Sequence, residues 1–188
     1  MCKNLCGLDY KIIGAEKIPK KKGIVFIKHS SVYELFVGLV LFSPSSWVAK
    51  YELMYLPLFR KAIKVFGFIP VKRGFGKSEV SRVIRDGTAR LGQGNWIVIF
   101  PEGTRVPHGE TKRYGLSGAL LAVGTSSNIT PIAHNAGRYW GRRSLIKKKG
   151  SIVFSIGSQI STFGKSYDEI NEEAKTWIDA ETKRIDSL

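Results

Sequence analysis

Residues 24–42 read IVFIKHSSVYELFVGLVLF and decide the fold class of this chain. Four apolar residues, 24–27, predict a short buried strand, and the stretch from Ser31 to Phe42 predicts a helix. Between the two lies a turn that contains His29, and Glu34 follows in the first helical turn. A buried strand that leads through a short turn into a helix is the repeating unit of α/β proteins.

The same alternation continues along the chain. Further strands are expected at 47–49, 68–71, 96–100, 129–133 and 151–156. Further helices are expected at 53–66, 78–91, 117–123 and 166–185. The last helix begins with Ser166-x-x-Glu169, the pattern of a capping box. We therefore expect one α/β domain over residues 1–188, with a central mixed or largely parallel sheet flanked by helices.

The charge of the chain points to an anionic partner. Among 188 residues there are 30 Lys and Arg against 15 Asp and Glu, a formal net charge of +15. The excess lies in residues 1–164, because residues 165–188 are slightly acidic. A field of this sign suits nucleic acid, an anionic membrane, phosphorylated substrates or an acidic carrier protein. Only two cysteines, Cys2 and Cys6, are present, which excludes a disulfide framework or a four-cysteine metal site.

The first candidate for chemistry is the pair His29 and Glu34. On one continuous helix, side chains five residues apart point in different directions. They can meet if His29 lies in the turn and Glu34 in the first helical turn, and the carboxylate would then orient a proton-accepting imidazole. The alternative is a capping box, Ser31-x-x-Glu34, in which the carboxylate binds backbone N–H groups instead.

The second candidate is Phe-Pro-Glu-Gly-Thr-Arg at 100–105, directly after a predicted buried strand. In open α/β sheets, ligands bind at the carboxyl ends of the strands. The planar guanidinium of Arg105 can bind a phosphate with two hydrogen bonds. The alternative is an ordinary turn with a surface ion pair, since Pro101 and Gly103 suit one.

Two further segments carry weaker signals. Lys72 and Arg73 end a short predicted strand and could bind a phosphate or lie as solvated charges at a sheet edge. Pro131, near the start of a buried strand, is typical of a sheet edge or of the wall of a pocket. His134 follows in the same strand, and alone it indicates a structural histidine.

Together these segments resemble the blocks of the glycerolipid acyltransferases, the 1-acyl-sn-glycerol-3-phosphate acyltransferases. The family pattern His-x4-Asp is similar to His29-x4-Glu34, and the other blocks are similar to residues 67–73, 100–105 and 129–131. The order and spacing also resemble those of the family, over about residues 5–180. Glu in place of Asp is similar to a bacterial branch, and one more methylene can still reach the histidine. The resemblance implies a glycerolipid acyltransferase-like fold.

The resemblance also implies a reaction: acyl transfer from an acyl thioester to the sn-2 hydroxyl of lysophosphatidic acid, giving phosphatidic acid for phospholipid synthesis. His29 would be the general base, and Glu34 would orient it. The residues expected to bind the substrate are Lys72, Arg73, Glu102, Gly103, Thr104, Arg105 and Pro131. Acyl-coenzyme A or acyl carrier protein would be the co-substrate, with no further cofactor and no metal, because His29, His108 and His134 lack ligand spacing.

The expected location is peripheral, on the cytoplasmic face of the inner membrane, with the anionic membrane surface as a partner. The longest apolar run, residues 35–42, is too short for a transmembrane helix, and the apolar N-terminal segment of the family is not expected here. Candidate interfacial segments are residues 53–68 and the pair Tyr139 and Trp140.

Three alternatives are considered. One is another acceptor, such as glycerol 3-phosphate or another lysophospholipid, and one is a basic nucleic-acid-binding domain, for which no reading motif is found. The third is a non-catalytic lipid-binding protein, against which the presence of His29, Glu34, Glu102 and Arg105 argues.

Overall fold

Seven strands form one sheet in the computed structural model, which describes residues 6–55, 67–72 and 76–188. The strands are β1 (Leu8–Ile13), β2 (Ile24–Ile27), β3 (Ser45–Lys50), β4 (Ile69–Val71), β5 (Trp96–Ile99), β6 (Ile129–His134) and β7 (Gly150–Ile156). Their order is β1-β7-β6-β2-β5-β3-β4, and only β6 and β7 pair antiparallel. The predicted α/β architecture with a largely parallel sheet is therefore confirmed.

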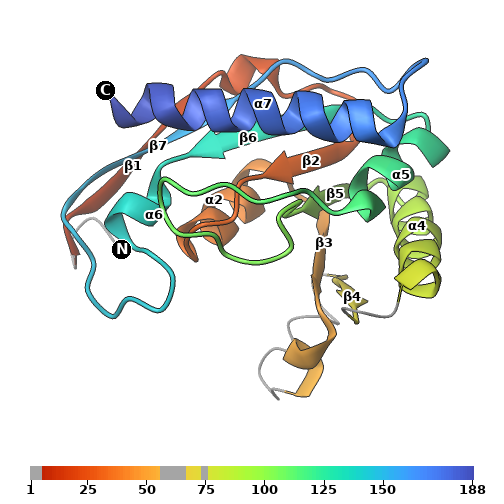
Figure 1. Ribbon diagram of the computed structural model, residues 1–188, viewed down its shortest axis with the longest axis horizontal. Helices are drawn as coiled ribbons and strands as arrows, with labels where there is room; N and C mark the ends of the chain where they lie inside the picture. Colours follow the sequence, from red (N-terminus) through yellow and green to blue (C-terminus); the bar gives the residue numbers. More distant parts are fainter. Residues whose placement is uncertain (1–5, 56–66, 73–75) are drawn as a thin grey trace.

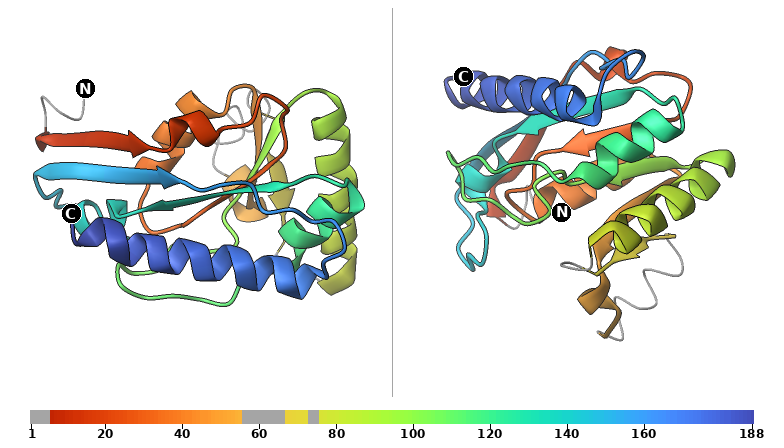
Figure 2. Two further views of the ribbon diagram at one scale, coloured as in Figure 1. Left: turned by 90° about the horizontal axis from the view of Figure 1, so that it is seen from above. Right: turned by 45° about the vertical axis from the view of Figure 1, so that its right-hand side comes forward.

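Helices cover both faces of this sheet (Figure 1). They are α2 (Tyr33–Leu41), α4 (Gly76–Gly92), α5 (Leu116–Gly124), α6 (Ala136–Tyr139) and α7 (Tyr167–Asp186), with short 3-10 turns η1 (Ala15–Lys17) and η2 (Tyr51–Tyr55). Viewed from above, α2 lies on one side of the sheet and α7 on the other (Figure 2, left). Among the described residues, no helix is both long and apolar enough to cross a bilayer.

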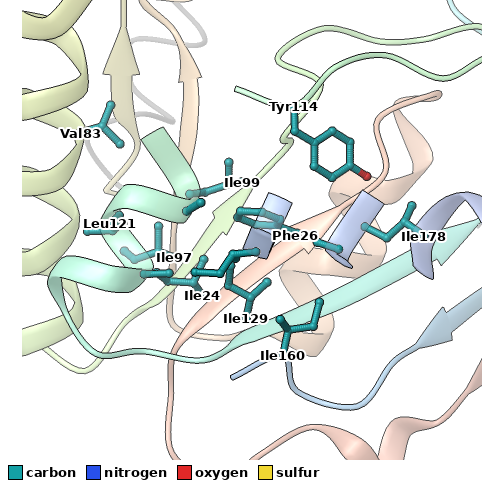
Figure 3. Packing of buried hydrophobic residues seen from close by; sticks show 14 of the residues in the cluster. Ile24, Phe26, Val83, Ile97, Ile99, Tyr114, Leu121, Ile129, Ile160 and Ile178 are labelled. Atoms are coloured by element: carbon teal, nitrogen blue, oxygen red, sulfur yellow. The ribbon is translucent and has the colours of Figure 1, made fainter. Parts of the chain in front are cut away.

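Strand β2 lies in the middle of the sheet and is buried on both faces, which explains its unbroken apolar run. Ile24 and Phe26 join the core cluster under α4, α5 and α7 (Figure 3). Val25 and Ile27 join the second cluster, under α2 and α6. Because successive side chains alternate between faces, His29 continues the row of Val25 and Ile27 on the α2 face.

Helix α2 packs closely on β3 because it carries a glycine at the contact. A Cβ atom on Gly38 would lie only 2.5 Å from Cη2 of Trp47. The indole of Trp47 is 1% exposed, so the ring has no room to retreat. This close approach fixes the position of the helix that bears Glu34.

The C-terminal helix α7 begins as its sequence predicts. The Ser166 hydroxyl accepts a hydrogen bond from the Glu169 backbone N–H, and the Glu169 carboxylate accepts one from the Ser166 N–H at 2.8 Å. The apolar face of the helix, with Ile170, Ala174 and Ile178, is fully buried against the sheet.

The structure departs from the sequence expectations at the sheet edges. Strand β1 was not expected; it pairs with β7, so the first and last strands of the chain are neighbours. Pro131 does not mark an edge, because β6 lies between β2 and β7. The antiparallel pairing with β7 begins only at Ile132, so the proline interrupts no rung of that ladder. Of the helix predicted at 53–66, residues 53–55 belong to η2 and residues 56–66 lie outside the described part.

Candidate active site

His29 and Glu34 meet at the carboxyl end of the central strand. His29 lies in the turn between β2 and α2, and its Nδ1 is 2.8 Å from Oε1 of Glu34, which lies in the first turn of α2. The predicted geometry is thus confirmed, and the longer Glu side chain reaches the imidazole. Because the carboxylate accepts the Nδ1 proton, Nε2 is the nitrogen that remains to accept a proton from a substrate.

The two roles considered for Glu34 turn out to be compatible. The same oxygen, Oε1, also accepts the backbone N–H groups of Ser30 at 3.1 Å and Ser31 at 3.0 Å. No strict capping box forms, since the residue that precedes α2 is Val32 and its side chain makes no cap. The carboxylate therefore holds both the backbone of the turn and the imidazole that the turn carries.

Glu34 is fully buried but remains ionised. Burial on its own would raise the pKa of this carboxyl group. The hydrogen bond from His29 and those from the backbone N–H groups outweigh burial, so the pKa of Glu34 lies below its ordinary value. A buried negative charge beside an imidazole stabilises the imidazolium that forms when His29 takes up a proton.

The His29 ring is held on its face as well as at its edge. It stacks on Phe100, with ring centroids 3.9 Å apart and planes 14° from parallel. Phe100 in turn packs against Trp47 at 5.6 Å. The backbone of His29 is fixed too, because its carbonyl accepts the N–H of Val106 at 2.7 Å. With 18% of its side chain exposed, the ring is oriented and still reachable by a substrate.

Glu102, which the sequence analysis expected to bind substrate, lies under the histidine. Its side chain is 1% exposed, and Oε2 accepts the backbone N–H of His29 at 3.2 Å. Burial raises the pKa of Glu102 to about 7, even though the Lys28 ammonium 3.9 Å away favours the charged form. In this position the Glu102 carboxylate holds the backbone of His29.

Lys28 is the residue that sequence reasoning missed. Its side chain is 3% exposed, and Nζ lies 3.6 Å from Asp179 of α7, 3.9 Å from Glu102 and 3.4 Å from the carbonyl of Glu110. The signal was available in the sequence, because a lysine directly after four buried apolar residues must find an anion. Lys28 thus ties the end of β2 to the turn after β5 and to α7.

His134 lies on the far side of Glu34. It is fully buried; Nε2 is 2.6 Å from the Lys28 carbonyl, and Nδ1 accepts the Ala136 N–H at 3.2 Å. This pattern places the proton on Nε2, which is also 3.9 Å from Oε2 of Glu34. Burial lowers the pKa of His134 despite that carboxylate, so the ring is neutral and has the structural role that the sequence indicated.

The remaining residues of the turn after β5 lie between Glu102 and Val106, both of which bond to the backbone of His29. Gly103 has a φ of 65° and donates its N–H to the Phe100 carbonyl at 2.9 Å, which closes the turn. Thr104 and Arg105 are half-buried, and the Arg105 carbonyl accepts a hydrogen bond from the Arg142 guanidinium at 3.4 Å.

Of the other predicted substrate-binding residues, Lys72 follows β4 and Pro131 lies in β6. Lys72 is exposed, with Nζ 4.6 Å from the centroid of the Tyr51 ring. Arg73 lies outside the described residues. Pro131 belongs to the opposite face of the sheet from His29, where its ring would lie 2.9 Å from a Cβ on Gly157. The described part of the chain contains no group of three or more His, Cys, Asp or Glu side chains that could hold a metal ion.

The arrangement can do one kind of chemistry well. A neutral imidazole with Nε2 available, held by a buried carboxylate, removes a proton from a hydroxyl group that approaches it. Arg105, whose neighbour Val106 bonds to the His29 carbonyl, carries a guanidinium of the kind that suits binding a phosphate.

The chain is similar to known proteins in sequence and in fold. Residues 9–135 match the family model described as Acyltransferase. A 1-acyl-sn-glycerol-3-phosphate acyltransferase from Pseudomonas aeruginosa is 35% identical over 177 residues, covering 93% of this chain and 69% of the relative. Another from Borreliella burgdorferi is 23% identical over 187 residues, covering 98% and 74%.

A solved structure shares the fold. The crystal structure of the 1-acyl-sn-glycerophosphate acyltransferase PlsC from Thermotoga maritima superposes with a TM-score of 0.81 and 21% identity. The match covers 96% of this chain and 73% of that one. The family match and the Pseudomonas relative together establish that this chain is an acyltransferase and belongs to the 1-acyl-sn-glycerol-3-phosphate acyltransferase family.

Proposed function

We propose that this enzyme transfers an acyl group from an acyl thioester to the sn-2 hydroxyl of lysophosphatidic acid, giving phosphatidic acid. The observation that carries the proposal is the His29–Glu34 pair, which leaves Nε2 as a base at the carboxyl end of the central strand. The names of the relatives support lysophosphatidic acid as the acceptor. The donor is acyl-coenzyme A or acylated acyl carrier protein, and either one releases a thiol when its acyl group is transferred.

The proposed reaction needs no acyl-enzyme. Nε2 of His29 takes the hydroxyl proton as the oxygen attacks the thioester carbonyl carbon. The tetrahedral intermediate collapses, the carbon–sulfur bond breaks, and the imidazolium returns its proton to the leaving thiolate. Glu34 stabilises the imidazolium between these steps. Ser31 is not a nucleophile in this scheme, since its hydroxyl accepts the Tyr33 N–H at 3.2 Å.

The acceptor phosphate would lie near the turn that carries Arg105, with Arg73 and Lys72 as further cations. Glu102 would act on the substrate only through His29, because its oxygens contact the His29 N–H and Lys28. Gly103 and Thr104 would shape the turn. We also propose that the enzyme acts at the cytoplasmic face of the inner membrane, where its formal charge of +15 favours anionic lipid.

The test is acyl transfer by the purified protein to lysophosphatidic acid from a labelled acyl thioester, in the wild type and in His29→Ala. His108→Ala is a matched control, because His108 pairs with Asp186 at 3.2 Å and lies outside the motifs. Phosphatidic acid should form with the wild type and the control and should be lost with His29→Ala. Equal product from His29→Ala would show that His29 is not the general base. Transfer to glycerol 3-phosphate and not to lysophosphatidic acid would show that glycerol 3-phosphate is the acceptor.

A further inference from the structure

The loop between α6 and β7 exposes two large aliphatic side chains. Residues 141–149 read GRRSLIKKK, and at the tip Leu145 is 90% exposed and Ile146 is 76% exposed. Leaving two adjacent aliphatic side chains exposed to water is unfavourable in free energy, and folded chains normally bury such pairs. Such a patch, rimmed by polar residues, indicates a surface on which something docks.

The fold itself holds this tip outward. The Lys148 N–H donates to the Tyr139 carbonyl at 2.8 Å, which closes the base of the loop. The Trp140 indole donates to the Ser144 carbonyl at 3.2 Å, and the Ser144 hydroxyl donates to the Ile146 carbonyl at 2.8 Å. Hydrogen bonds on both sides of the tip therefore hold Leu145 and Ile146 in exposed positions.

The structure therefore shifts the candidate membrane anchor from Tyr139 and Trp140 to residues a few positions later in the chain. Tyr139 and Trp140 are half-buried and pack against the core cluster under α2 and α6. Trp140 also lies under the Lys147 ammonium, 4.8 Å from its ring centroid. These aromatic residues support the loop, and Leu145 and Ile146 form its contact surface.

The loop is strongly basic. Its cations flank the apolar tip on both sides: Arg142, Arg143, Lys147, Lys148 and Lys149. The sequence contains no acidic residue between Glu110 and Asp168, so no carboxylate near it in sequence offsets this charge. Aliphatic side chains between clustered cations match the boundary of an anionic bilayer, where headgroup phosphates lie above acyl chains.

The loop is also connected to the active site. Arg142, at its start, donates to the carbonyl of Arg105 in the turn after β5. Figure 1 shows the loop, in light blue, projecting on the side away from α7, as η2 also does. A membrane on that side would lie next to the turn that we propose to bind the acceptor phosphate.

We propose that this loop docks the enzyme on anionic lipid bilayers. Leu145 and Ile146 insert at the boundary between headgroups and acyl chains, and the flanking cations bind lipid phosphates. The site then faces a lipid acceptor in the same bilayer; this consequence rests on the proposed function, whereas the docking does not.

The test is flotation of the full chain with vesicles of phosphatidylcholine alone and of phosphatidylcholine mixed with phosphatidylglycerol. The wild type should float with the anionic vesicles and poorly with the neutral ones. Leu145→Ser/Ile146→Ser, which changes no charge, should lower the partition coefficient about tenfold or more. Lys148→Gln/Lys149→Gln should lower it as well and weaken its salt dependence.

Two controls match these variants. Phe163→Ser removes an equally exposed apolar side chain, 93% exposed, from the segment between β7 and α7 at the opposite end of the molecule (Figure 1). Lys20→Gln/Lys21→Gln removes two cations before the amino end of β2, away from the site at its carboxyl end. Both controls should float like the wild type.

Wild-type flotation by the serine variant would overturn the proposal, as would binding that does not depend on phosphatidylglycerol. Retained flotation with lost binding to acyl carrier protein would assign the loop to that protein instead. Activity on detergent-dispersed lysophosphatidic acid separates docking from chemistry, because the loop variants should keep the wild-type rate there and lose it on vesicles. If the wild type transfers no acyl group in either assay, the proposed function fails while flotation still decides the docking.

Discussion

The ammonium group of Lys28 lies 3.6 Å from a carboxylate oxygen of Asp179, joining the strand that leads to the active-site histidine with the last helix of the chain. The two residues are 151 positions apart in sequence, and the lysine is almost fully buried. The same ammonium faces Glu102, whose carboxylate accepts the His29 N–H. Helix α7 is therefore connected to His29, the proposed general base, through Lys28 and Glu102.

Replacing Lys28 should damage both stability and turnover. Lys28→Met leaves the buried Glu102 without its cation, whereas Asp179 keeps Lys175, and we expect the free energy of unfolding to fall by about 3–5 kcal/mol. The kcat should fall about tenfold or more with a smaller change in KM, because the His29 backbone loses its support. Urea unfolding and steady-state kinetics measure the two effects.

Lys175→Met is the matched control. Lys175 also pairs with Asp179, at 2.9 Å, but its side chain is 27% exposed, so its loss should cost less than about 1 kcal/mol and leave kcat unchanged. Adding Glu102→Gln to Lys28→Met removes one unpaired charge and should restore part of the lost stability. Equal effects of the two lysine variants would contradict the role given to Lys28.

The charge of Glu34 should matter more than the length of its side chain. Glu34→Gln keeps the size but loses the negative charge, so kcat should fall about a thousandfold. Glu34→Asp keeps the charge and shortens the reach to His29 and to the Ser30 and Ser31 N–H groups, so we expect a smaller loss. The measurement is kcat for both variants, and greater activity in Glu34→Gln than in Glu34→Asp would refute this ranking.

Glu102 should make stability depend on pH. Its pKa is raised from 4.5 to about 7 in the folded protein, so between these values the native state keeps a proton that the unfolded chain has lost. The contribution of Glu102 to the free energy of unfolding is therefore fully present below about pH 4.5, and it is lost as the pH rises to about 7. Relative to Glu102→Gln, the wild type should lose about 3 kcal/mol across this window.

Urea unfolding at several pH values tests this, with Glu169→Gln as a control of opposite sign. The backbone hydrogen bond from Ser166 and that from its hydroxyl lower the pKa of Glu169, so the wild type should gain stability over that variant as pH rises through the acid range. A difference between the wild type and Glu102→Gln that is independent of pH would show that Glu102 is ionised throughout.

Two glycines should respond oppositely to alanine. Gly38→Ala would bring a methyl group within 2.5 Å of the buried Trp47 ring, displace α2 and cost about 1–3 kcal/mol. Gly92→Ala, in α4, has no atom within 4 Å of the new methyl group and should raise stability by about 0.5–1 kcal/mol. Thermal unfolding measures both; the activity of Gly38→Ala should fall as well, because α2 carries Glu34.

Much of the fold follows from local patterns in the sequence. The run of apolar residues 24–27 predicts a strand buried on both faces, and the Ser166 and Glu169 pair predicts the start of α7. Strand β1 escaped because only Leu8 among its residues is fully buried, so the segment lacks the unbroken apolar run of the inner strands. Its partner, β7, is far away in the sequence, so nothing in residues 8–13 themselves indicates that they will pair with it.

The site was predicted where its residues are close in sequence. His29 and Glu34 are five positions apart, so the geometry of one turn could be reasoned through. The contact between Lys28 and Asp179 depends on how α7 crosses the sheet, and only the fold supplies it. Glu102 was correctly placed at a strand end, but the direction of its side chain, toward the His29 backbone, required the structure.

The pairing of β1 with β7 has a consequence for synthesis on the ribosome. Residues 8–13 leave the exit tunnel early, yet their partners, residues 150–155, follow only when most of the chain has been made. The central strand meets β5 much sooner, and the turn after β5 contacts His29 soon afterwards. The contacts around His29 can therefore begin to form while β1 still lacks its partner, but Lys28 remains without Asp179 until α7 has been made. Until β7 follows, the backbone N–H and C=O groups of β1 are exposed to pairing with other chains.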